Sequence, residues 1–221
     1  MPTSLPGPRS TTSYAVLGLL SVRTWTTYEL TKQVQRSLRW FWPRAERRIY
    51  DEPKALVAAG LATARKEYTG QRPRTVYAIT DDGRAALRDW LGAPPAPRTL
   101  ESEALLKIFF ADAGSLEELI GTLRAVEAEA VDRLTALAAM AEQSAEGLTA
   151  FPERGHISAL GLRLHLQDEA AVLGWARWAL AQVAEWRSST DPAAWDARAE
   201  LARLVADVEE ILSADADLAE K

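Results

Sequence analysis

The spacing of apolar residues predicts helices along most of the chain, with one short interruption by alternating segments. The first helical segment, through Tyr14, Leu17 and Leu20, has apolar groups on nearly all sides, which is typical of a helix buried in a core. A second helix is predicted behind Thr26, with its apolar side chains on one stripe. Thr26 and Glu29 have the spacing of a capping box, which marks the start of that helix.

A third helix is predicted over residues 44–59, and Gly60 stands where a glycine commonly follows a helix. Pro53 does not suit a helix interior, where it costs about 3 kcal/mol or kinks the axis. Asp51 and Glu52, directly before it, suit a helix that breaks and restarts at this point.

Residues 61–68 and 75–79 are predicted to be two strands, joined by turn residues at 70–74. Thr80 can cap a closing helix whose first turn contains Asp81 and Asp82. Three helices, a two-stranded hairpin with a basic tip and a closing helix predict a winged helix-turn-helix domain over residues 10–92.

A proline-rich linker at residues 93–97 separates this domain from residues 99–221, which have helical patterns throughout. A short helix is predicted over 102–111, and a long helix from Ser115 repeats its apolar residues at close to 3.5 residues, as packed helices do. Asp191-Pro192 predicts the start of the last helix. The expected fold class is therefore mainly α, a winged helix-turn-helix followed by an all-α dimerisation domain.

The long helix predicted over residues 152–186 has two apolar faces. A single neighbouring helix cannot cover both, so we expect it to pack within its own chain and against a second copy. One face carries Ile157, Leu160, Leu164, Ala171, Trp175 and Trp178, and the other carries Leu162, Leu166, Leu173 and Leu180.

Charge is distributed unevenly between the two segments. Residues 1–98 carry sixteen Lys and Arg against eight Asp and Glu, a formal +8, whereas residues 99–221 carry ten against twenty-three, a formal −13. Because a B-DNA major groove accepts one helix, a basic helix beside a basic hairpin predicts double-stranded DNA as the partner. The candidate contacts are Arg44, Arg47, Arg48, Tyr50 and Lys54 on the third helix, Lys66, Arg72 and Arg74 on the wing, and Tyr28 and Lys32 on the second helix.

A set of short motifs resembles the PadR family of transcriptional regulators. The motifs are YAVLGLL at 14–20, YEL at 28–30, IY at 49–50 followed by Lys54, AGL at 59–61, and RPRTVYAIT at 72–80 followed by Gly83. The chain departs from the family pattern at Thr26-Thr27 and at Arg47-Arg48, so the resemblance does not transfer a base preference. It implies a homodimer whose C-terminal domain mediates dimerisation and, in several members, helps form a small-molecule pocket. We interpret the chain as a sequence-specific regulator, a homodimeric repressor that reads an inverted repeat.

Two aromatic groups have alternative interpretations. His165, Asp168, Trp175 and Trp178 could line an effector pocket, but packing in a dimer core is the simpler interpretation, with Arg163 or Arg177 as the partner of Asp168. Residues 40–42, Trp-Phe-Trp, could stack on bases, but we favour a clamp between helices.

Composition argues against several other classes of function. Cysteine is absent, the two histidines lie in no metal-site spacing, and no nucleophile or phosphate-loop motif occurs, so we expect no enzyme, metal or cofactor. The longest apolar run is too short to span a membrane, and a cytoplasmic protein is expected. The remaining alternative is a winged-helix protein-interaction adaptor that does not bind DNA.

Overall fold

The computed structural model describes residues 10–42, 48–69 and 72–219, without the side chains of Arg39, Thr69, Arg72 and residues 215–219. The chain divides into two compact units, residues 1–98 and 99–221. The mainly α fold class predicted from the sequence is confirmed.

The first unit is built around α1 (Thr11–Val22), which is buried or half-buried at every position from 12 to 22, as its apolar pattern predicts. Val16 and Leu17 have no exposed surface. Ser10 caps the helix by accepting a hydrogen bond from the Ser13 backbone N–H at 3.2 Å.

Three strands form the sheet, one more than the pattern predicts. The two long strands, β2 (Ala62–Thr69) and β3 (Arg72–Ile79), pair antiparallel, and β3 includes residues 72–74 that were predicted to lie in the turn. A two-residue strand, β1 (Trp25–Thr26), pairs with the other edge of β3. Two residues are too few to show a period of two, so alternation could not reveal β1.

The helices around the sheet begin and end at the predicted capping residues. Thr26 and Glu29 form the full capping box of α2 (Thr27–Arg36), which leads into the short η1 (Leu38–Trp40). The predicted third helix is broken, as Pro53 indicates: Arg48 is helical, a turn follows, and α4 (Glu52–Ala58) restarts with Pro53 in its first turn. Gly60, with φ 76°, ends α4.

The closing helix α5 (Asp81–Gly92) is capped by Thr80 and is tied to α1 by the stacked rings of Tyr14 and Trp90, 4.8 Å apart. The prediction that residues 40–42 pack between helices is confirmed only in part. Trp42 donates from Nε1 to the hydroxyl of Thr12 in α1 at 3.0 Å, whereas Phe41 is 58% exposed.

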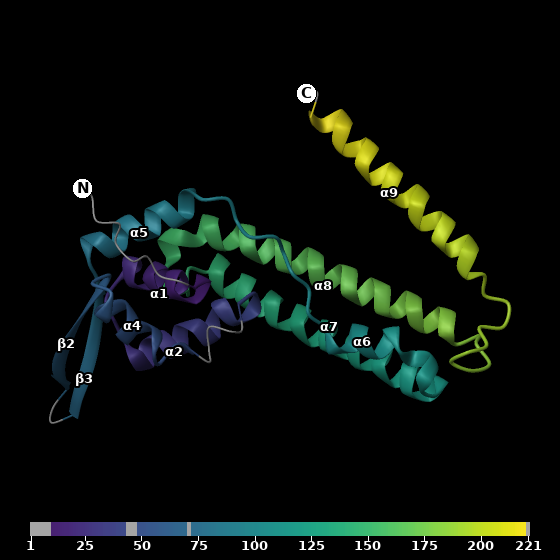
Figure 1. Ribbon diagram of the computed structural model, residues 1–221, viewed down its shortest axis with the longest axis horizontal. Coiled ribbons are helices and arrows are strands. Elements are labelled where there is room, and N and C mark those ends of the chain that lie inside the picture. The colour runs from purple at the N-terminus through teal and green to yellow at the C-terminus, as the bar shows by residue number, and fades with distance from the viewer. Residues whose placement is uncertain (1–9, 43–47, 70–71, 220–221) are drawn as a thin grey trace. The chain divides into compact units, whose positions relative to one another are not determined.

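The second unit is helical. Its elements are α6 (Glu103–Phe109), η2 (Ala111–Ala113), α7 (Leu116–Ala145), η3 (Pro152–Arg154), α8 (Gly155–Val183) and α9 (Ala197–Ala219). The long helices α7 and α8 lie side by side (Figure 1). Their apolar cluster contains Leu119, Leu123, Ala179 and Val183.

The predicted start of the last helix at Asp191-Pro192 is wrong. Asp191 pairs with Ser188 in a β-bridge and accepts a hydrogen bond from the Ala193 backbone N–H, so it closes a turn. The helix begins five residues later, where the Asp196 side chain accepts from the backbone N–H groups of Arg198 and Ala199.

Candidate nucleic-acid interface

The N-terminus of α2 presents two of the predicted contacts together. Tyr28 is 70% exposed, and the ammonium group of Lys32 lies 5.5 Å from the centre of its ring. The four-residue spacing places both side chains on one face of α2, with the phenol and the ammonium directed outward. This face therefore presents a hydroxyl and a cation that can bind a phosphate.

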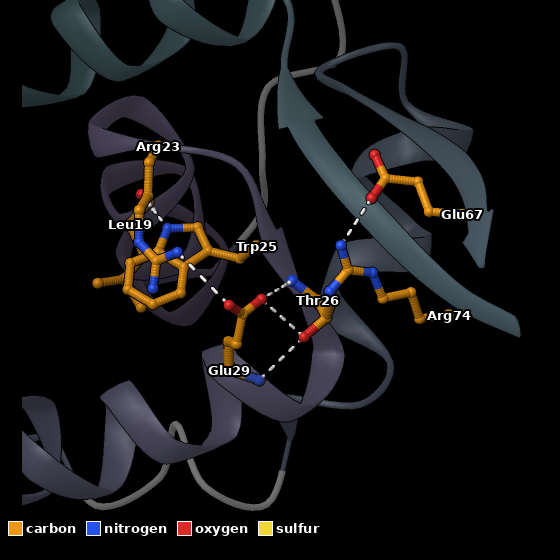
Figure 2. Close-up of polar contacts among 7 residues, drawn as sticks. All are labelled: Leu19, Arg23, Trp25, Thr26, Glu29, Glu67 and Arg74. Atoms are coloured by element: carbon orange, nitrogen blue, oxygen red, sulfur yellow. Dashed lines mark hydrogen bonds and ion pairs between the residues drawn. The ribbon is translucent and has the colours of Figure 1, made fainter. Parts of the chain in front are cut away.

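Glu29 stabilises the first turn of α2 (Figure 2). Its carboxylate accepts hydrogen bonds from the backbone N–H and the hydroxyl of Thr26, both at 2.8 Å, and lies 3.5 Å from Arg23. The bond from the Thr26 backbone, followed by the Thr26 hydroxyl and the charge of Arg23, holds the pKa of Glu29 below its ordinary value although desolvation opposes this. Arg23 also stacks over the ring of Trp25, whose indole donates to the Leu19 carbonyl at 2.7 Å.

The wing carries three charged side chains on one face. Glu67 lies opposite Arg74 in the strand register, and its carboxylate accepts from Arg74 Nη2 at 3.0 Å and from Arg65. These two guanidinium groups, Arg65 first, lower the pKa of Glu67, so the carboxylate is ionised at neutral pH. Lys66, paired with Thr75 in the register, lies on the opposite face because side chains alternate along a strand.

The turn before α4 and its first residues carry the third group of contacts. Tyr50 is 58% exposed, and Lys54 lies 3.9 Å from Asp51 in an exposed pair. The Arg48 guanidinium lies 3.6 Å from Glu52, and Glu52 is buried and accepts from the Ser13 hydroxyl at 2.7 Å.

The structure brings some of these contacts together. Tyr28 and Arg74 line one shallow groove between the start of α2 and the wing, with Thr26, Thr27, Glu29 and Thr75. Arg48, Tyr50 and Lys54 form a separate group around the start of α4. Arg44 and Arg47 lie outside the described residues, and of Arg72 only the backbone is described, as the first residue of β3.

Two exposed arginines beside these groups were not predicted as contacts. Arg65 shares Glu67 with Arg74, and Arg36 follows Lys32 by one helical turn on α2. The four-residue spacing from Lys32 to Arg36 was a usable signal, whereas the position of Arg65 depends on the hairpin register.

The predicted effector residues lie along α8. His165, Asp168 and Trp175 are half-buried and Trp178 is 42% exposed. Trp175 packs against the apolar cluster of its own chain, together with Trp186, so intrachain packing accounts for it without a second copy. Arg177, which like Arg163 was considered as a partner of Asp168, pairs with Glu127 at 2.8 Å.

The second unit also contains a partly buried ion pair and an apolar groove. Glu169, next to Asp168, is buried and accepts from Arg133 of α7. A groove on α6 and the start of α7 is lined by residues that include Leu106, Phe110 and Leu119, and none of the predicted effector residues lines it.

Comparison with known proteins connects both units to one group of regulators. The chain matches the Transcriptional regulator PadR-like family over residues 16–89 and the Virulence activator alpha C-term family over residues 101–184. It is 30% identical to the negative transcriptional regulator PadR of Bacillus subtilis over 176 residues, 77% of this chain and 96% of that protein. The chain belongs to the PadR family. The resemblance seen in its motifs is thereby confirmed, and with it the interpretation as a DNA-binding transcriptional regulator.

Solved structures of that relative agree in fold. Bacillus subtilis PadR in complex with operator DNA matches with a TM-score of 0.70 at 28% identity, over 80% of this chain and 99% of that one. The same protein in complex with p-coumaric acid matches with a TM-score of 0.62 at 28% identity, over 78% of this chain and 98% of that one.

Two features are absent from the described residues. None of the helices in the described ranges is long and apolar enough to cross a membrane. Within the same ranges, His, Asp and Glu side chains form no group of three or more that could hold a metal ion.

Proposed function

We propose that this PadR-family chain is a cytoplasmic homodimeric repressor that reads an inverted-repeat operator. The turn before α4 and α4 itself would contact bases and phosphates through Arg48, Tyr50 and Lys54. The start of α2 and the wing would contact the backbone through Tyr28, Lys32, Lys66 and Arg74. Arg44, Arg47 and Arg72 remain proposed contacts on sequence grounds.

The groove shared by Tyr28 and Arg74 is the observation that supports this arrangement best. It joins the start of α2 to the wing, so a phosphate there can receive hydrogen bonds from both elements. The crystal structure of Bacillus subtilis PadR with operator DNA supports the same use of the fold.

The exposed apolar face of α8 supports a homodimer. Ile157, Leu160 and Leu164 recur at helical spacing on α8 and are 52%, 73% and 51% exposed. Continuous apolar patches of this kind mark interfaces more often than free surface. Leu160→Asp should therefore yield monomers in sedimentation, whereas Leu148→Asp, an exposed leucine outside α8, should not.

We also propose that a small molecule bound to the helical unit releases the DNA. Bacillus subtilis PadR has been crystallised with p-coumaric acid, which supports an aromatic acid as the first probe. p-Coumaric acid should quench the tryptophan fluorescence of the helical unit and weaken operator binding. Unchanged fluorescence and unchanged DNA affinity would contradict an effector of this class.

Selection of bound duplexes from a random pool, followed by a salt titration, tests the proposed function. An inverted repeat should be recovered, and six phosphate contacts should reduce affinity about a thousandfold between 50 and 200 mM salt. Lys54→Ala should weaken binding and flatten the salt dependence. Lys107→Ala is the matched control, because Lys107 also pairs with a carboxylate three or four residues before it but lies in the other unit. Recovery of no preferred sequence, with no salt-sensitive binding, would favour the protein-interaction adaptor.

A further inference from the structure

Glu67 is a carboxylate placed between two cations on the wing, Arg65 and Arg74. Its two oxygens bind different guanidinium groups: Oε1 accepts from Arg65, and Oε2 accepts from Arg74 Nη2 at 3.0 Å, the bond drawn in Figure 2. The three side chains share one face of the hairpin and carry a net charge of +1, where the two arginines alone would carry +2.

A contribution to folding stability does not account well for the presence of this cluster. The two arginine side chains are 76% and 49% exposed, and exposed ion pairs contribute little to folding because water screens them. The position of Arg74 is more informative, since it also lines the groove shared with Tyr28. The cluster therefore lies where the proposed function expects a phosphate.

The bond to Glu67 leaves Arg74 able to contact DNA. A guanidinium has five N–H donors in a fixed plane, and the bond from Arg74 to Glu67 uses one of its nitrogens. The remaining donors suffice for a two-pronged contact to a phosphate. Glu67 can thus hold the guanidinium in one orientation and, through its charge, repel every phosphate near the wing.

From this geometry we propose that Glu67 is a specificity-determining residue that positions Arg74 and limits binding to unselected DNA. This inference rests on the proposed contact between the wing and the DNA backbone. On an operator, where α4 also docks, the oriented Arg74 makes a contact that compensates for the repulsion. On other duplexes the wing binds without α4 in register, and the negative charge weakens that binding.

Substituting Glu67 separates the two effects. Glu67→Gln keeps the size of the side chain and removes the charge, whereas Glu67→Asp keeps the charge and shortens the reach to both arginines. Each phosphate contact accounts for about a threefold change in affinity between 50 and 200 mM salt. Between 200 and 50 mM salt, Glu67→Gln should therefore gain about threefold more affinity for an unselected duplex than the unmodified protein does, a logarithmic slope steeper by about 0.9.

The test measures affinity for the selected operator and for an unselected duplex, in the full-length protein, from 50 to 200 mM salt. Glu142→Gln is the matched control, because it changes the net charge equally from an exposed position on α7. Glu67→Gln should lower the ratio of operator to unselected affinity about threefold, and Glu142→Gln should leave it unchanged. Glu67→Asp should weaken operator binding without strengthening unselected binding.

Arg74→Ala distinguishes failure of this inference from failure of the proposed function. If Arg74→Ala leaves affinity and salt dependence unchanged, the wing does not contact DNA and the proposed function is wrong at that surface. If Arg74→Ala weakens binding while Glu67→Gln matches Glu142→Gln, the wing contacts DNA but Glu67 does not set specificity. Weaker binding of Glu67→Gln to both duplexes would also overturn the inference.

Discussion

Gly83 lies in the first turn of α5, directly against the backbone of the hairpin. A Cβ atom at this position would lie 2.1 Å from the Leu61 carbonyl oxygen and 2.8 Å from a side-chain carbon of Ile79. The carbonyl oxygen cannot move aside at little cost, because it accepts a hydrogen bond from the Thr80 backbone N–H at 3.1 Å. Gly83→Ala must therefore shift α5 away from the hairpin or break that bond.

The magnitude follows from two opposing contributions. Overpacking of a tight contact costs about 1–3 kcal/mol, and the upper end applies here because the neighbour is backbone. Replacing glycine by alanine in a helix stabilises by up to about 1 kcal/mol. The net loss in free energy of unfolding should be about 2 kcal/mol. Gly18→Ala in α1 is the matched control, because a Cβ there meets no atom within 4 Å, and it should stabilise by up to about 1 kcal/mol.

Urea unfolding at a fixed protein concentration, followed by circular dichroism, measures both variants. With a slope of about 2 kcal/mol per molar urea, Gly83→Ala should lower the midpoint by about 1 M while Gly18→Ala raises it. A midpoint for Gly83→Ala at or above that of the unmodified protein would refute the close approach of α5 to Leu61. Equal losses in both variants would mean that the effect is not specific to this contact.

Three further outcomes are expected in the same unfolding assay. Thr26→Ala removes the cap of α2 and should cost about 1 kcal/mol, whereas Ser213→Ala at an exposed site should cost almost nothing. Because the pKa of Glu29 is lowered in the folded state, its contribution to stability is present above the ordinary value of 4.5 and is lost as pH falls through the lowered pKa. The difference in free energy of unfolding between the unmodified protein and Glu29→Gln should therefore shrink from about pH 7 to about pH 3. A constant difference would contradict this. Arg133→Met removes the guanidinium partner of the buried Glu169 and should cost about 2 kcal/mol, most of which Glu169→Leu should restore in the double variant.

The features that could be predicted from the sequence are those decided by neighbouring residues. The caps at Thr26 and Ser115, each with a glutamate three residues later, form as the spacing indicates. The break before Pro53 also depends only on local chain chemistry. In each case the partner groups lie within one helical turn, so the spacing alone determines the contact.

The features that could not be predicted depend on partners distant in the sequence. Strand β1 forms because Trp25 and Thr26 meet Tyr77 and Val76, some fifty residues later. Asp191 and Asp196 are both plausible helix caps by residue type, and the bridge to Ser188 gives Asp191 a different role.

The charges of the candidate interface show the same limit of sequence reasoning. The formal +8 of residues 1–98 counts each cation as free, but three proposed contacts have a carboxylate within 4 Å. Arg48 lies 3.6 Å from Glu52, Lys54 lies 3.9 Å from Asp51, and Arg74 lies 3.0 Å from Glu67.

These pairs lower the positive potential that the first unit presents to a duplex, and they differ in how firmly they do so. Asp51 is exposed, so its pairing with Lys54 yields readily to a phosphate. Glu52 is buried and accepts a hydrogen bond from Ser13, so its carboxylate is held in place near Arg48. An interface whose cations are partly neutralised in this way should bind unselected DNA weakly. Tight binding then depends on correct base contacts and on two copies of the chain acting together. The proposed homodimer on an inverted repeat would satisfy both requirements, because it would double the number of contacts only where both half-sites are present.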